Sequence, residues 1–240
     1  MSFNLPSLVI LSLTTIPERI QVTRKIIESE LNELSGNFVI VLNLPLSYKN
    51  KTKTFTLDKN FHAETKKLEK LAFSSNGKFI LNRCNDYGPL TKLLPTLSLN
   101  LPKESILLVR DDNCYHAEAF SILANRQIKE LSKSFTYYSY EYNNTKIPQG
   151  VDIISFWLPN LSNFKTFAEH SLKNEYCFHV DDMVIGKFLK NNGIQVETVK
   201  RLWKWAWKPD CFNGSSNFSL FGKKGEYSRE NSSKMCDKYI

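Results

Sequence analysis

The chain has 240 residues, enough to bury one sizeable core, and its 42% hydrophobic and 23% charged residues exclude wholesale disorder. Its formal net charge of +8 favours an anionic partner, such as a nucleotide, a nucleic acid or an acidic membrane surface, without choosing among them. The start, MSFNLPSLVILSL, has no basic segment before its apolar run, and that run is too short to span a bilayer. We therefore read it as a strand and expect no transmembrane segment.

The apolar pattern predicts alternating strands and helices. A strand at 8–13, a helix from about Ile20 to Gly36 and a strand at 38–43 form a βαβ unit, which implies a parallel sheet with a right-handed crossover. Later elements are expected as helices at 63–73, 90–97, 117–131 and 181–193 and as strands at 78–82, 106–109 and 135–142. The fold class is therefore α/β. We expect one domain over residues 1–209, with 210–240 as its polar C-terminal tail or lid.

The cysteine pattern predicts the redox state of the chain. The five cysteines are odd in number, widely spaced and never in a Cys-x-x-Cys pair: Cys84, Cys114, Cys177, Cys211 and Cys236. This pattern predicts reduced thiols, a cytoplasmic location and no structural zinc.

An acidic pair, Asp111 and Asp112, follows the apolar run 106–109. Open α/β sheets keep their ligands at the carboxyl ends of strands, and a divalent cation relieves the repulsion between adjacent carboxylates. The alternative is a solvated acidic turn that caps the helix beginning near Ala117. The pair on its own favours the turn.

Two further stretches carry chemistry. In RCNDYGPLTKLLPTL (83–97) the Gly88-Pro89 turn precedes an expected helix, and Lys92 in its first turn opposes the helix dipole. A nearby anion explains this lysine, and an exposed surface lysine explains it equally well. Asp181 and Asp182 open the helix that ends at Gly193, where N-capping is the simple interpretation.

Four segments occur in the order seen in one enzyme family: TTIPERI (14–20), DYGPLTKLLPTL (86–97), the acidic pair at 111–112 and VDD (180–182). Over roughly residues 8 to 207 the chain resembles glycosyltransferases of the GT-A fold, of the family-2-like type. The resemblance implies a GT-A-like, Rossmann-like, mixed and mainly parallel sheet. It also implies inverting transfer of a sugar from a UDP-, GDP- or dTDP-sugar to a hydroxyl of a glycan or other acceptor, with Mn²⁺ or Mg²⁺ as cofactor.

The resemblance also implies roles for individual residues. Asp182 would be the general base, and Asp181 would orient the acceptor or cap the helix. Asp112 would bind the metal, with Asn113 as a further ligand. The residues implied in donor binding are Thr14, Thr15, Pro17, Arg19, Asp86, Lys92, Arg110 and Asp111.

The acidic motif departs from the family pattern, because relatives usually have three consecutive aspartates where this chain has Arg110, Asp111 and Asp112. In one frame Asp112 keeps the metal. In a shifted frame the motif is Asp111-Asp112-Asn113, whose amide oxygen also coordinates cations. Arg110 would pair with a phosphate and lessen the need for metal, or would mark a non-catalytic relative. Both frames stay open.

The remaining patterns are less specific. Residues 151–160 resemble the acceptor side of relatives without their usual glycines, and 201–210 alternates tryptophans as in a buried sheet face or an indole beside an acceptor. His179 is expected to be structural, with contact to metal or diphosphate as the alternative. Two rival functions are a metal-dependent nuclease or nucleotidyltransferase and an inactive binding module. No nucleic-acid partner is expected, and peripheral contact with an anionic membrane surface stays open.

Overall fold

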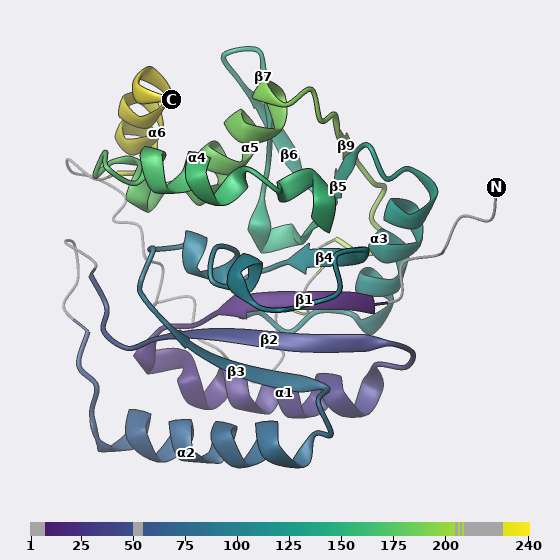
Figure 1. Cartoon of the computed structure of the whole chain (residues 1–240), viewed down its shortest axis with the longest axis vertical. Coiled ribbons are helices and arrows are strands. Elements are labelled where there is room, and N and C mark those ends of the chain that lie inside the picture. Colours follow the sequence, from purple (N-terminus) through teal and green to yellow (C-terminus); the bar gives the residue numbers. More distant parts are fainter. Residues whose placement is uncertain (1–7, 50–54, 205, 207, 209–227) are drawn as a thin grey trace.

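The computed structural model describes residues 8–49, 55–204, 206, 208 and 228–240, which are built around a seven-stranded sheet (Figure 1). The strand order is β3-β2-β1-β4-β8-β5-β9. The strands are β1 (Leu8–Thr14), β2 (Phe38–Pro45), β3 (Phe79–Cys84), β4 (Ser105–Val109), β5 (Ser134–Thr136), β8 (Ile154–Trp157) and β9 (Val196–Thr198). β1 to β4 are parallel, β8 is antiparallel to both β4 and β5, and β5 is parallel to β9. This confirms the expected mixed, mainly parallel α/β sheet.

Helices cover both faces of the sheet (Figure 1). One face packs against α1 (Ile20–Glu33), α2 (Lys59–Ser74) and α3 (Ala117–Lys129), and the other against α4 (Phe164–Ser171) and α5 (Asp181–Asn191). Successive strand residues alternate between the two cores, as Leu107 and Leu108 of β4 do. A hairpin of β6 (Ser139–Tyr142) and β7 (Thr145–Pro148) lies beside α5, and α6 (Arg229–Tyr239) ends the chain. Within the described part of the chain, no helix is both long and apolar enough to cross a membrane.

Three expected elements differ from the structure. The helix expected at 90–97 is two 3₁₀ turns, Leu90–Lys92 and Thr96–Ser98, because Pro95 cannot donate the backbone hydrogen bond that a continuous helix needs. The strand expected at 135–142 is split between β5 of the main sheet and β6 of the hairpin. The sheet face expected at 201–210 is wrong for 201–204, which contain no strand, since Trp203 instead stacks on His116 with ring centroids 4.4 Å apart. Trp205 and Trp207 lie outside the described residues.

The prediction of reduced thiols is wrong for at least three cysteines. Cys177 and Cys236 form a disulfide across a separation of 59 residues, and Cys114 is also disulfide-bonded. Cys84 keeps a free thiol, whose pKa burial raises to about 12. The disulfide depends on α6 folding back onto the domain, which cysteine spacing does not reveal. The argument for a cytoplasmic location from reduced thiols is lost with it.

Candidate functional site

The residues predicted to be functional gather at the carboxyl edge of the parallel strands, where open α/β sheets hold their ligands. The loops after β1 and β4 lie there, as does the turn after β3. These loops carry Thr15, Asp111 and Asp86 respectively.

A buried polar network fixes the segment that contains Lys92. Ser12 of β1 donates a hydrogen bond to the carbonyl of Lys92 at 2.5 Å, and its hydroxyl lies 2.6 Å from that of Thr96. Asn43 of β2 donates to Thr96 at 2.7 Å and accepts from Asn82 of β3 at 2.8 Å. Buried polar groups need such partners, so these side chains hold the segment in one position on the sheet.

Lys92 links the acidic groups of the site. Its ammonium lies 2.7 Å from Asp111 Oδ1 and 2.7 Å from Asp181 Oδ2. Burial opposes its charge, but Asp111, Asp181 and Asp182 together raise the pKa of Lys92 well above its ordinary value. The anions that the sequence led us to expect near Lys92 are therefore the protein's own carboxylates. The alternative of an exposed surface lysine is wrong, since its side chain is only 4% exposed.

Asp182 is held at both carboxylate oxygens. Oδ1 accepts a hydrogen bond from the backbone N–H of Gly150 at 3.0 Å, and Oδ2 accepts one from Arg229 of α6 at 2.7 Å. Burial and the neighbouring Asp181 raise the pKa of Asp182 to about 7, against the opposing effects of Lys92 and Arg229. The N-cap of α5 is Val180, so neither acid occupies the capping position. A carboxyl group with a pKa near neutrality is suited to general base catalysis.

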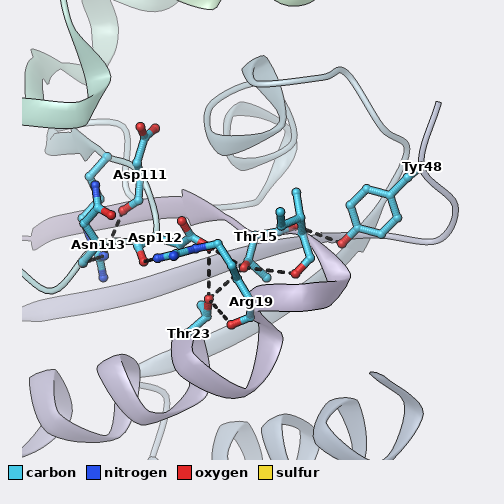
Figure 2. A network of polar contacts seen from close by, with 9 residues as sticks. Thr15, Arg19, Thr23, Tyr48, Asp111, Asp112 and Asn113 are labelled. Carbon is cyan, nitrogen blue, oxygen red and sulfur yellow. Dashed lines mark hydrogen bonds and ion pairs between the residues drawn. The ribbon is translucent and has the colours of Figure 1, made fainter. Parts of the chain in front are cut away.

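The two adjacent acids of the 111–112 pair point in different directions (Figure 2). Asp112 Oδ2 accepts hydrogen bonds from Thr15 at 2.6 Å, Arg19 Nε at 2.8 Å and Thr23 at 3.3 Å. Arg19 also donates to the backbone carbonyl of Asp112 at 2.7 Å. The Asp111 side chain points away from this network and is 40% exposed. Asp112 thus joins the loop to α1, and Asp111 faces Lys92.

Arg110 does not take the predicted place beside a donor phosphate. Its side chain is fully buried and ion-paired with Glu30 of α1. It also donates to the carbonyls of Asp111 at 3.2 Å and Asn113 at 3.3 Å. Arg110 therefore supports the backbone of the loop that carries Asp111, Asp112 and Asn113. We correct its assignment from donor contact to loop support, because a guanidinium with no exposed surface cannot bind a ligand in place.

A pocket opens beside this cluster and brings together three of the predicted donor residues, Thr14, Thr15 and Asp86. Asp86 accepts from the N–H of Lys49 at 2.6 Å and from that of Gly88 at 2.9 Å, so it orders the rim of the pocket. Pro17 is buried in a 3₁₀ turn and is not part of the pocket wall.

The pocket also has an aromatic wall that the sequence reasoning missed. It consists of Tyr48, Phe55 and Phe178, and His179 lies next to it. Tyr48 donates from its hydroxyl to the carbonyl of Thr15 at 2.9 Å. The only sequence signal was aromatic residues following β2 and preceding Asp181, which does not distinguish a pocket from a core.

The fit of a divalent metal is partial. The described residues contain no group of three or more His, Cys, Asp and Glu side chains placed to hold one. Asp112 Oδ1 and the side chain of Asn113 accept no hydrogen bond from the described residues, and both are hard oxygen ligands. Arg19 competes for the negative charge of Asp112.

The arrangement defines a Rossmann-like α/β fold that is found among glycosyltransferases. The structure is similar to that of the mannosyltransferase PcManGT from Pyrobaculum calidifontis in complex with GDP-Man and Mn²⁺, with a TM-score of 0.54 and 10% sequence identity. The match covers 82% of this chain and 56% of that structure, so the chain spans little more than half the length of this neighbour. No protein-family model and no curated protein matches the sequence. At this identity the similarity shows the fold alone.

Proposed function

We propose that the chain is a glycosyltransferase that moves a sugar from a nucleotide-diphosphate donor to an acceptor hydroxyl with inversion. The observation that carries the proposal is Asp182, a buried carboxyl at the carboxyl edge of the sheet whose pKa is raised to about 7. A base with that pKa is partly ionised at neutral pH and can still accept a proton. The fold shared with a mannosyltransferase supports the same reaction class.

In the proposed reaction the acceptor hydroxyl binds beside Asp182 and transfers its proton to that carboxylate as its oxygen attacks the sugar's anomeric carbon. The bond between that carbon and the diphosphate breaks, and the electron pair leaves with the nucleoside diphosphate. Attack from the face opposite the leaving group inverts the anomeric centre. Lys92 is ion-paired with Asp111 and Asp181, and by compensating these two carboxylates it lessens their repulsion of the developing negative charge of the leaving group. Asp181, in contact with Lys92, orients the acceptor side.

The pocket beside the charge cluster is proposed to bind the nucleoside of the donor. Aromatic side chains offer faces on which a base stacks, and Thr14, Thr15 and Asp86 supply polar groups at the rim. Arg19 is proposed to act on the donor indirectly, because its guanidinium holds Asp112 in place.

We propose that Asp112 and Asn113 are the residues that would hold Mn²⁺ or Mg²⁺. When bound, the cation would neutralise part of the diphosphate charge. Because Arg19 already neutralises Asp112, we expect metal affinity to be low in the absence of a donor. We also propose that the protein works in a compartment that permits disulfides, because Cys177 and Cys236 are joined.

Contacts of Lys92 and Arg110 bear on the two rival functions, a two-metal nuclease and an inactive binding module. A two-metal nuclease was suggested by the acidic pairs, but Lys92 lies between Asp111 and Asp181 and already compensates their charge. An inactive binding module was suggested by Arg110 and by the missing glycines of residues 151–160, and the ion pair of Arg110 with Glu30 gives the arginine a structural role.

Calorimetric titration with UDP-, GDP- and dTDP-sugars, each with and without Mn²⁺, tests donor binding, and product analysis of the binding donor tests transfer. We expect one nucleotide to bind more tightly in the presence of Mn²⁺. Substituting Thr15→Val at the pocket should weaken that binding, whereas Ser29→Ala on the exposed side of α1 should leave it unchanged. Absence of binding by every nucleotide under both conditions would refute the proposal.

A further inference from the structure

The C-terminal helix α6 (Figure 1) contacts α5 and the 3₁₀ turn Cys177–His179. The disulfide joins Cys236 to Cys177, which lies in the 3₁₀ turn just before α5. Asp237 forms an ion pair with Lys187 of α5 and accepts a hydrogen bond at 2.7 Å from Asn143 between β6 and β7. These contacts hold the C-terminal end of α6 against α5 and the turn between β6 and β7.

Arg229, the first residue of α6, contacts Asp182, the proposed base. Its guanidinium lies 2.7 Å from Asp182 Oδ2, and its carbon lies 5.9 Å from the centre of the Tyr140 ring. The N-cap of α6 is Ser228, whose hydroxyl accepts from the N–H of Asn231 at 3.3 Å. The backbone that carries Arg229 is therefore ordered by its own cap.

The groups that face Asp182 come from five elements. They are Asp181 of α5, Lys92 of the 3₁₀ turn after β3, the N–H of Gly150, Tyr140 of β6 and Arg229 of α6. The Lys92 ammonium contacts Asp111 and Asp181 at 2.7 Å each. Of the described cations, Arg229 is the one that forms an ion pair with Asp182 itself.

We propose that Arg229 is a positioning residue for the reaction: from the C-terminal helix it fixes the Asp182 carboxylate in charge and orientation beside the acceptor site. The inference rests on the proposed function of Asp182 as base. It makes the last twelve residues of the chain, 229–240, part of the catalytic machinery and explains why a disulfide ties α6 to the turn preceding that base.

The effect of Arg229 on the pKa of Asp182 predicts how the pH dependence of activity changes when Arg229 is replaced. Arg229 lowers the pKa of Asp182, while burial and Asp181 raise it. Removing the guanidinium should raise the Asp182 pKa, so that less of the base is ionised at neutral pH. An opposite charge in contact shifts a carboxyl pKa by about 1 or more, so we expect a rise of about 1. A rise of about 1 from a pKa near 7 would reduce the ionised fraction of Asp182 at pH 7 roughly fivefold.

The test compares Arg229→Gln with Arg229→Lys and with the matched control Lys187→Gln. Lys187→Gln removes an ion pair that docks α6 but leaves Arg229 on Asp182. The Asp182 pKa is read directly by carboxyl NMR titration, assigned with Asp182→Asn, and the pH profile of kcat/KM is measured alongside it.

We expect Arg229→Gln to raise the Asp182 pKa by about 1 and to shift the acidic limb of the kcat/KM profile to higher pH by the same amount. The donor KM should stay unchanged. Arg229→Lys should restore most of the wild-type profile. Lys187→Gln should lower the melting temperature without moving the profile. An active enzyme whose Arg229→Gln variant keeps the wild-type Asp182 pKa and pH profile overturns the role of Arg229 alone. Wild-type protein that transfers no sugar overturns the proposed function instead.

Discussion

The Lys92 side chain packs against Gly150, where no Cβ atom is in its way. Adding a Cβ atom at Gly150 therefore tests whether the ion pairs of Lys92 with Asp111 and Asp181 hold it in a fixed position. A Cβ atom added at Gly150 would lie 2.4 Å from Lys92 Nζ, 2.9 Å from its Cε and 3.7 Å from Asp182 Oδ1. The ammonium would have to move by about 1 Å to reach an ordinary contact of 3.4 Å. It cannot move that far and keep both 2.7 Å contacts unless Asp111 and Asp181 follow.

We therefore expect Gly150→Ala to cost about 1–3 kcal/mol of unfolding free energy, the usual range for overpacking, and to weaken donor binding at least tenfold. Urea unfolding and donor titration measure the two effects. The matched control is Gly186→Ala, whose Cβ would lie 2.5 Å from Ile147 Cδ1 and would overpack an apolar contact. It should destabilise the protein with little change in donor affinity. A Gly150→Ala protein with wild-type stability and wild-type donor affinity would refute the idea that Lys92 is held fixed.

Asp182→Asn should lower turnover by roughly 10² to 10⁴ with donor affinity close to wild type, and full activity in this variant would remove Asp182 from the mechanism. Because the pKa of Asp182 is raised from 3.8 to about 7 in the folded protein, the stability it contributes is fully present below 3.8 and is lost as the pH rises through 7. Urea unfolding at pH 5 and pH 8 should therefore show a smaller difference for Asp182→Asn than for wild type, and equal differences would contradict the raised pKa. Asp112→Asn should lose metal-dependent donor binding and also destabilise the acidic loop by about 1–3 kcal/mol, whereas Asp111→Asn should lose less binding; equal losses would favour the shifted metal frame. Cys236→Ser, which removes the Cys177–Cys236 disulfide and leaves Cys114 unchanged, should lower the unfolding free energy by about 2–4 kcal/mol, and free thiols at both positions under non-reducing mass spectrometry of the wild type would show that the disulfide does not form.

The sequence by itself determined several of the elements and the edge at which the candidate functional residues gather. The βαβ start, the strand before Asp111 and the helix that opens at Asp181 were predicted within a few residues, because apolar periodicity and terminating glycines are local signals. The parallel order of β1 to β4 then requires their carboxyl ends to share an edge. That reasoning placed the candidate residues at one edge of the sheet without a structure.

Only the tertiary structure decided which partner each charged side chain has. In the sequence Arg110 indicates a disrupted acidic motif, whereas in the structure it is ion-paired with Glu30, 80 residues away. Asp111 and Asp112 are neighbours in sequence, yet one contacts Lys92 and the other Arg19. A charge in a folded protein is stabilised by whatever the fold brings within a few ångströms, and the sequence does not encode that distance locally. For the same reason, neither the Cys177–Cys236 disulfide nor the contact of Arg229 with Asp182 could be read from the chain alone.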